Sequence, residues 1–205
     1  MEPTLTIPPG PCRKSAGFTL LEMLVVTAIV LLMATMVLPA VNSVIFSYRI
    51  ADTGARIAAM IEQGRAHATV SQRVVGMRFF QGADSKEFTA VALVEIIPGS
   101  GGGLTTNALS RPFHFTDSLI LSQTHSSLLS ATSSAGSGSA LLSGENTPYR
   151  DFLIFPDGST SLTSFATNPC LAVLNRHDLE SDGQPDNPLV VSIDPVTCRV
   201  TTYRK

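Results

Sequence analysis

The chain has 205 residues, 15% of them charged, and a formal net charge of −2 at pH 7; its mean hydropathy is +0.25. A chain of this length suits one ordinary domain, and a composition this apolar excludes a fully disordered protein. Because acidic and basic residues nearly balance, we do not expect nucleic acid to bind the surface as a whole. Three cysteines are too few for a disulfide scaffold.

An apolar segment near the N-terminus is the most informative part of the sequence. Residues 18–38 contain one ionisable side chain, Glu22, and as a helix they would be about 31 Å long, close to the thickness of a bilayer's hydrocarbon. Arg13 and Lys14 precede them, which favours a cytoplasmic N-terminal side. We therefore expect a single span with the rest of the chain across the membrane. The run is too long for a secretory signal peptide, and a simple signal anchor is the alternative.

The residues around the start of this apolar segment indicate a more specific class of membrane-anchored protein than a simple signal anchor. Residues 14–22, KSAGFTLLE, resemble the processing site of type IV prepilins and type II secretion pseudopilins. The resemblance implies that a prepilin peptidase cuts between Gly17 and Phe18 and methylates the new amine on Phe18. Glu22 would then be the fifth mature residue, and Pro39 would stand where many such proteins carry a helix-kinking proline. It also implies other pilin or pseudopilin subunits as partners, and a bacterial inner-membrane location with a periplasmic or extracellular C-terminal domain.

The position of Glu22 needs a physical reason. A carboxylate inside a membrane span costs on the order of 2.5–3.5 kcal/mol on insertion scales. In a stack of processed subunits, the cationic amine of Phe18 in one copy could pair with Glu22 of a neighbour and offset that cost. Our hypothesis is that Glu22 serves assembly, so that Glu22→Ala would enter the membrane but join filaments poorly.

Beyond the span the helix should continue with a different character. Pro39 lacks an N–H and should kink or locally open the helix. Residues 47–68 then carry apolar or small residues at spacings of three and four, typical of a helix with one buried face: Ile50, Gly54, Ile57, Ile61, Gly64 and Ala68. We divide the chain into a leader (1–17), a transmembrane or filament-core helix (18–46), an amphipathic helix half (47–72) and a β-rich head (73–205).

The head should be an antiparallel sheet. Alternation and β-branched runs predict strands at 73–80, 87–97, 113–121, 152–155, 162–165, 170–175, 189–193 and 198–203. We expect loops at 81–86 and 98–103, and a mobile low-complexity excursion at 126–144. The segments FLIFPDGST and LVVSIDPVTCRVTTY resemble the C-terminal sheet of H-class minor pseudopilins and FimT-like pilins, although Thr197-Cys198-Arg199 replaces their Thr-Gly-Arg turn. A further resemblance, in length and in the RFFQ strand, is to Verru_Chthon cassette pilin-like proteins. The expected fold is therefore α+β and pilin-like, with a long N-terminal helix packed on a C-terminal antiparallel sheet.

Two cysteines remain after leader removal, Cys170 and Cys198. An even pair in an oxidising compartment favours a disulfide, which would close a loop worth about 3–4 kcal/mol in the chain-entropy model. The alternative is two buried thiols on neighbouring strands.

Two charged segments are further candidates. Asp178, Glu180, Asp182 and Asp186 surround a glycine turn, an arrangement that presents hard oxygen ligands to Ca²⁺, although Leu189 stands where an EF-hand needs glutamate. A solvated acidic turn is the alternative. Arg199, Arg204 and Lys205 form a basic end, which in FimT-like pilins implies DNA contact; an ordinary solvated strand end is the alternative.

No catalytic constellation is present in the sequence. The four histidines, at 67, 114, 125 and 177, are scattered and have no metal-ligand spacing. We therefore expect a structural subunit, a minor pilin or pseudopilin of a type II secretion or type IV pilus filament, and no cofactor other than the candidate Ca²⁺. The alternatives are a FimT-like minor pilin that binds DNA or surfaces at a filament tip, and a membrane-anchored enzyme.

Overall fold

A computed structural model describes residues 17–82, 87–99, 104–116, 118–129, 136–162, 169–176, 185 and 188–204, without the side chains of 36–40, 43 and 136. The chain divides into two compact units, 1–45 and 46–205. Residues 46–205 are called the head from here on; they include helical residues as well as the β-rich part predicted at 73–205.

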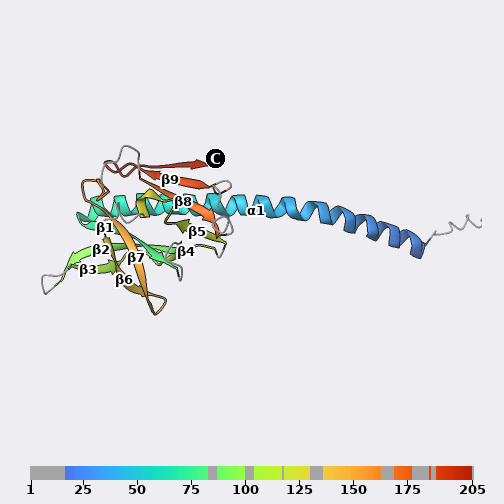
Figure 1. The fold of residues 1–205 in the computed structure, drawn as a ribbon, viewed down its shortest axis with the longest axis horizontal. Coiled ribbons are helices and arrows are strands. Elements are labelled where there is room, and N and C mark those ends of the chain that lie inside the picture. The colour runs from blue at the N-terminus through green and yellow to red at the C-terminus, as the bar shows by residue number, and fades with distance from the viewer. Residues whose placement is uncertain are drawn as a thin grey trace, which may run out of the picture. The chain divides into compact units, whose positions relative to one another are not determined.

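A single helix, α1, runs from Leu20 to Ser71 (Figure 1). It remains helical through residue 39, so the local opening expected at Pro39 is not present in its secondary structure. The helix ends where Gln72 takes a left-handed φ of 55° and the Arg73 N–H donates to the Ala68 carbonyl at 3.3 Å. This is the Schellman arrangement, which satisfies carbonyls at a helix end.

The described part of the head forms one antiparallel sheet, in the order β10-β9-β8-β5-β2-β1-β7-β6, with β3 and β4 also paired to β2 (Figure 1). The strands are β1 Val74–Gln81, β2 Glu87–Pro98, β3 Leu104–Ala108, β4 Phe113–His114, β5 Leu119–Ser122, β6 Gly136–Leu142, β7 Glu145–Ile154, β8 Cys170–Asn175, β9 Leu189–Ile193 and β10 Val200–Arg204; η1 is a short 3-10 helix, Ser127–Leu129. The α+β prediction, a helix with an antiparallel sheet, is confirmed.

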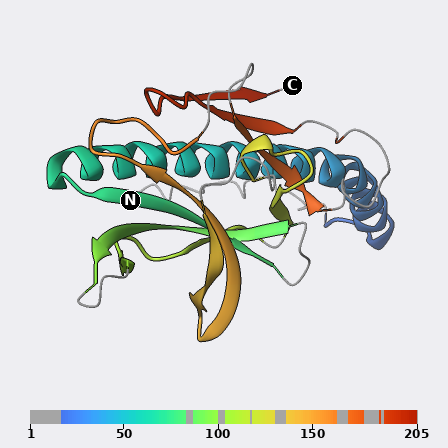
Figure 2. The same ribbon diagram turned by 60° about the vertical axis from the view of Figure 1, so that its left-hand side comes forward.

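The sheet curves around the part of α1 that belongs to the head (Figure 2). Ile50, Ile57, Ile61 and Ala68 of α1 are buried in one core with buried apolar side chains of six strands, β1, β2, β5, β7, β8 and β9, as the spacing of three and four predicts. Gly54 permits a close approach of α1 to β9, since a Cβ on Gly54 would collide with Leu189. Thr160, in the segment after β7, binds the β9–β10 turn. Its N–H and its Oγ1 both donate to the Pro195 carbonyl, at 3.0 and 2.7 Å.

The expectation of a mobile excursion at 126–144 is wrong for the part that the structure describes. Residues 136–142 form β6, which pairs with β7 through a two-residue turn in which Ser143 and Gly144 both have positive φ. That combination matches the twist of antiparallel strands. Gly138 lies directly against Tyr149, which leaves no room for a Cβ. The glycines that suggest low complexity in the sequence thus permit strand packing.

Other limits also differ from expectation. β3 was not predicted, and β7 begins at Glu145, several residues before the predicted strand. Of the strand predicted at 162–165, Leu162 is described and is not part of a strand, and 163–165 lie outside the described residues. An isolated bridge joins Ile154 to Thr160.

Candidate functional site

The first described residues surround the predicted processing position. Gly17, Phe18 and Thr19 are not helical and are exposed, and α1 begins at Leu20. Thr19 caps the helix: its Oγ1 accepts a hydrogen bond from the Glu22 N–H at 3.2 Å, and its carbonyl accepts one from the Met23 N–H at 3.2 Å. Threonine followed three residues later by glutamate is the spacing of a capping box. The cap at Thr19 was not predicted, although this spacing is visible in the sequence.

None of the residues that the structure describes requires glycine at position 17. A Cβ built on Gly17 would meet no heavy atom within 4 Å, and its φ lies outside the left-handed region. Alanine would therefore fit there without steric or backbone strain. Close approach of another molecule to this exposed backbone would give glycine a role there.

The first half of α1 exposes its apolar side chains. Twelve large hydrophobic residues between 18 and 33 are 47–85% exposed: Phe18, Leu20, Leu21, Met23, Leu24, Val25, Val26, Ile29, Val30, Leu31, Leu32 and Met33. An apolar surface of this size marks a site covered by lipid or by other protein. Glu22 is exposed among them, and it forms no ion pair with any residue that the structure describes.

Within the described residues, no helix combines the length and apolar character that a membrane crossing needs. The side chains of residues 36–38 of the expected span, and that of Pro39, lie outside the described part of the chain.

Cys170 and Cys198 are free thiols, so the structure departs from the expected bridge. In β8, Leu171 and Val173 contribute to the core with Cys198, and side chains alternate along a strand. Cys170 therefore faces the other side of the sheet, where its Sγ accepts from Ser127 Oγ at 3.4 Å. Burial, with a smaller contribution from the charge of Glu62, raises the pKa of Cys198 to about 12.

The acidic candidates for Ca²⁺, Asp178, Glu180, Asp182 and Asp186, lie outside the described residues. Among residues that are described, no group of three or more potential ligands could hold a metal ion.

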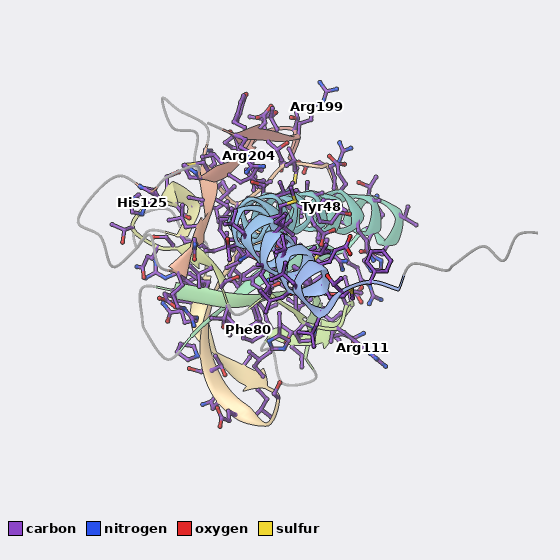
Figure 3. All side chains as sticks on the ribbon, turned by 90° about the vertical axis from the view of Figure 1, so that its right-hand side faces the viewer. Tyr48, Phe80, Arg111, His125, Arg199 and Arg204 are labelled. Atoms are coloured by element: carbon purple, nitrogen blue, oxygen red, sulfur yellow. The ribbon has the colours of Figure 1, made fainter. Side chains whose placement is uncertain are left out.

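The structure does not gather the basic end into one patch. Arg199 follows the β9–β10 turn and Arg204 ends β10 (Figure 3), so about 16 Å of strand separates them. The Arg204 guanidinium donates to the Ser47 carbonyl at 3.3 Å and to Ser47 Oγ at 2.9 Å. It therefore holds the last strand to α1. Lys205 lies outside the described residues.

A buried ion pair was not predicted at all. Arg78 of β1 and Asp151 of β7 are 5% and 8% exposed, with Nη2 and Oδ2 3.2 Å apart. The guanidinium carbon of Arg78 lies 3.6 Å from the centre of the Tyr149 ring, while its Nε is buried and has no hydrogen-bond partner among the residues that the structure describes. Burial raises the pKa of Asp151 above its ordinary value, although the hydrogen bond and charge of Arg78 act to lower it. A charged residue inside the apolar run of β1 is a sequence sign of such a pair, but its partner is 73 residues away.

An open pocket of about 400 Å³ lies where the end of β1 and strands β2 and β4 meet the β6–β7 turn. Hydroxyl and amide side chains, among them Thr89, Ser143 and Asn146, make up much of its lining, and His114 and Glu145 add ionisable groups. No hydrogen bond joins His114 to Glu145 among those found for the described residues. The pocket does not assemble a catalytic constellation from them.

Comparison with known proteins supports the resemblance of the N-terminal segment to prepilins. Residues 12–38 match the prokaryotic N-terminal methylation motif, which confirms the resemblance of this segment to prepilins. The match covers this N-terminal segment, and the helix-on-sheet architecture agrees with the α+β fold that the sequence predicts. No curated protein sequence matches the chain.

Two solved structures are similar in arrangement. The minor pseudopilin EpsH from the type 2 secretion system of Vibrio cholerae is 9% identical, with a TM-score of 0.42 over 77% of this chain and 96% of that one. The type IV minor pilin FimU of Pseudomonas aeruginosa is 14% identical, with a TM-score of 0.44 over 77% and 90%. Because both identities and both TM-scores are low, these likenesses concern only the arrangement of the helix and strands.

Proposed function

We propose that this chain, which carries a prepilin-type methylation motif, is a structural subunit of a pilin or pseudopilin filament, cut after Gly17 and N-methylated on Phe18. The observation that supports this most directly is Gly17 itself. It lies within the matched motif, in exposed non-helical backbone, and neither its φ nor its surroundings require glycine. A peptidase that must fit closely around the scissile bond supplies the missing reason, because only glycine lets another backbone approach without a Cβ.

The exposed apolar half of α1 supports assembly as the role of the mature protein. Before assembly, residues 18–38 anchor the chain in the inner membrane as a single pass, with the head in the periplasm. In the filament the same side chains pack against other subunits, and Glu22 pairs with the Phe18 amine of a neighbour. An ion pair of this kind sets the register of packing, since an unpaired charge in an apolar surrounding is strongly destabilising.

Cleavage is tested by the mass of the N-terminal peptide, from cells with an active prepilin peptidase and from cells without it. We expect wild-type chain to begin at methylated Phe18 only where the peptidase is present, and Gly17→Ala to retain its leader in both. A wild-type chain that keeps Met1 in the presence of active peptidase contradicts the proposal.

Assembly is tested separately with Glu22→Ala. We expect this variant to reach the membrane fraction in normal amounts and to be depleted from sheared filaments, with Glu62→Ala, an exchange in the head, as the matched control. Equal incorporation of Glu22→Ala and wild type would remove the role of Glu22.

A DNA-binding minor pilin is the second candidate, because Arg199 is exposed on the head. Few basic side chains are available together for DNA, because Arg199 lies apart from Arg204 and Arg204 contacts Ser47. If the full chain binds DNA in a salt-dependent way and Arg199→Ala weakens that binding, this candidate is favoured. Ca²⁺ at the acidic segment 178–186 also remains a proposal, which calorimetric titration at millimolar Ca²⁺ decides.

A further inference from the structure

We infer that Thr19 is a positioning residue for leader removal: its cap on α1 holds the Gly17–Phe18 bond outside the helix. The inference rests on the proposed function, in which this bond is the one that is cut. Hydrolysis adds one water across the amide and leaves a carboxylate on Gly17 and an ammonium group on Phe18. The role of Thr19 lies in the shape of the substrate before that step.

The geometry at the start of α1 carries the inference. The Thr19 side chain accepts from the Glu22 N–H at 3.2 Å, which is the bond that an N-cap residue makes to the third helical residue. Leu20 is then the first helical residue. The scissile bond lies just before the cap, where Phe18 is 76% exposed and Gly17 has open space around it. Peptidases act on backbone that is open and not hydrogen-bonded within a helix, and the cap supplies that state.

The sequence upstream explains why a cap is needed. Ser15 and Gly17 are also residue types that begin helices. A helix that began at either would include Phe18 in its first turn and would draw the scissile bond into helical backbone. The hydroxyl of Thr19 favours the shorter helix. An N-cap typically changes such an equilibrium by about fivefold, from the ~1 kcal/mol that its loss costs.

A second threonine of α1 provides the matched control. Thr27 Oγ1 donates to the Leu24 carbonyl at 2.9 Å, so its hydroxyl bonds within the helix and caps nothing. Thr27→Val removes the same hydroxyl from the same helix half. Thr19→Ser keeps an acceptor at the cap and should restore what Thr19→Val loses.

The experiment measures the rate of leader loss from full-length chain in membranes that contain prepilin peptidase, with each new N-terminus identified by peptide mass. We expect Thr19→Val to be cut about fivefold more slowly than wild type, and Thr19→Ser and Thr27→Val at the wild-type rate. Precursor in the membrane fraction is quantified for each variant, so that rates refer to inserted substrate.

The outcomes separate this inference from the proposed function. If wild type is not cut after Gly17, the proposed function fails. If wild type is cut there but Thr19→Val is cut at the same rate or faster, only the positioning role is refuted. Equal slowing of Thr19→Val and Thr27→Val, or no rescue by Thr19→Ser, also overturns it.

Discussion

Removing either member of the Arg78–Asp151 pair should strongly destabilise the head. Arg78 is 5% exposed, so Asp151→Leu leaves a guanidinium buried without its carboxylate. Breaking a buried pair in this way costs about 3–5 kcal/mol. Arg78→Met leaves the opposite charge and also removes the contact with Tyr149, 3.6 Å from the ring centre. The double variant carries no buried charge at these two positions, so it should be more stable than either single variant.

The measurement is a double-mutant cycle of urea unfolding on the full chain in nonionic detergent, followed by far-UV circular dichroism. Because the two residues contact each other, the double variant should differ from the sum of the singles by at least about 2 kcal/mol. Single variants that cost under about 1 kcal/mol, or strict additivity, would show that solvent screens the pair, contrary to the burial described above.

The pair also predicts a dependence on pH. Burial raises the pKa of Asp151 above 3.8, so the folded state binds this proton more tightly than the unfolded state does. The stability from that proton is fully present below pH 3.8 and is lost as pH rises through the folded pKa. In Asp151→Asn this component should be missing from the curve of unfolding free energy against pH; an unchanged curve contradicts the assigned direction.

Three further predictions concern packing, thiols and the last strand. Gly54→Ala should lower the free energy of unfolding by about 1–3 kcal/mol in the same assay, because the new methyl group collides with Leu189. The exchange Ala59→Ser, at an exposed position of α1, should change it little. Equal effects would show that α1 can move away from β9. Cys170 should react with a thiol reagent in the native protein well before Cys198, whose pKa is raised to about 12 by burial, and peptide mapping that finds a bridge or equal labelling would contradict the free thiols. Arg204→Ala should speed amide hydrogen exchange in β10, because it loses both bonds to Ser47, while Arg199→Ala should not; identical exchange in both variants would remove the anchoring role of Arg204.

Several parts of the fold could be predicted because they depend on neighbouring residues. The buried stripe of α1 follows from helical periodicity, and Ile50, Ile57 and Ile61 are all in the core. β1 and β2 are confirmed within a residue or two of their predicted limits, since each is a long run of β-forming residues bounded by polar turns.

Other parts could not be predicted because their cause is distant in the chain. Gly138 belongs to a strand only because β7 pairs with it and Tyr149 lies against it. The thiols of Cys170 and Cys198 stay apart because their side chains lie on different sides of the sheet, which the sequence spacing does not encode. The cap at Thr19 differs from both: its four-residue pattern is local, and it could have been predicted.

The linear order of residues was sufficient to identify the processing motif, the apolar N-terminal helix and the α+β class, because each depends on side chains within a few turns or strand lengths of one another. Only the tertiary structure decided that Arg78 meets Asp151, that the two cysteines remain free and that Arg204 holds the last strand to α1. The two contacts join residues 73 and 157 positions apart, and they form only when the sheet curves around the helix and buries a common core.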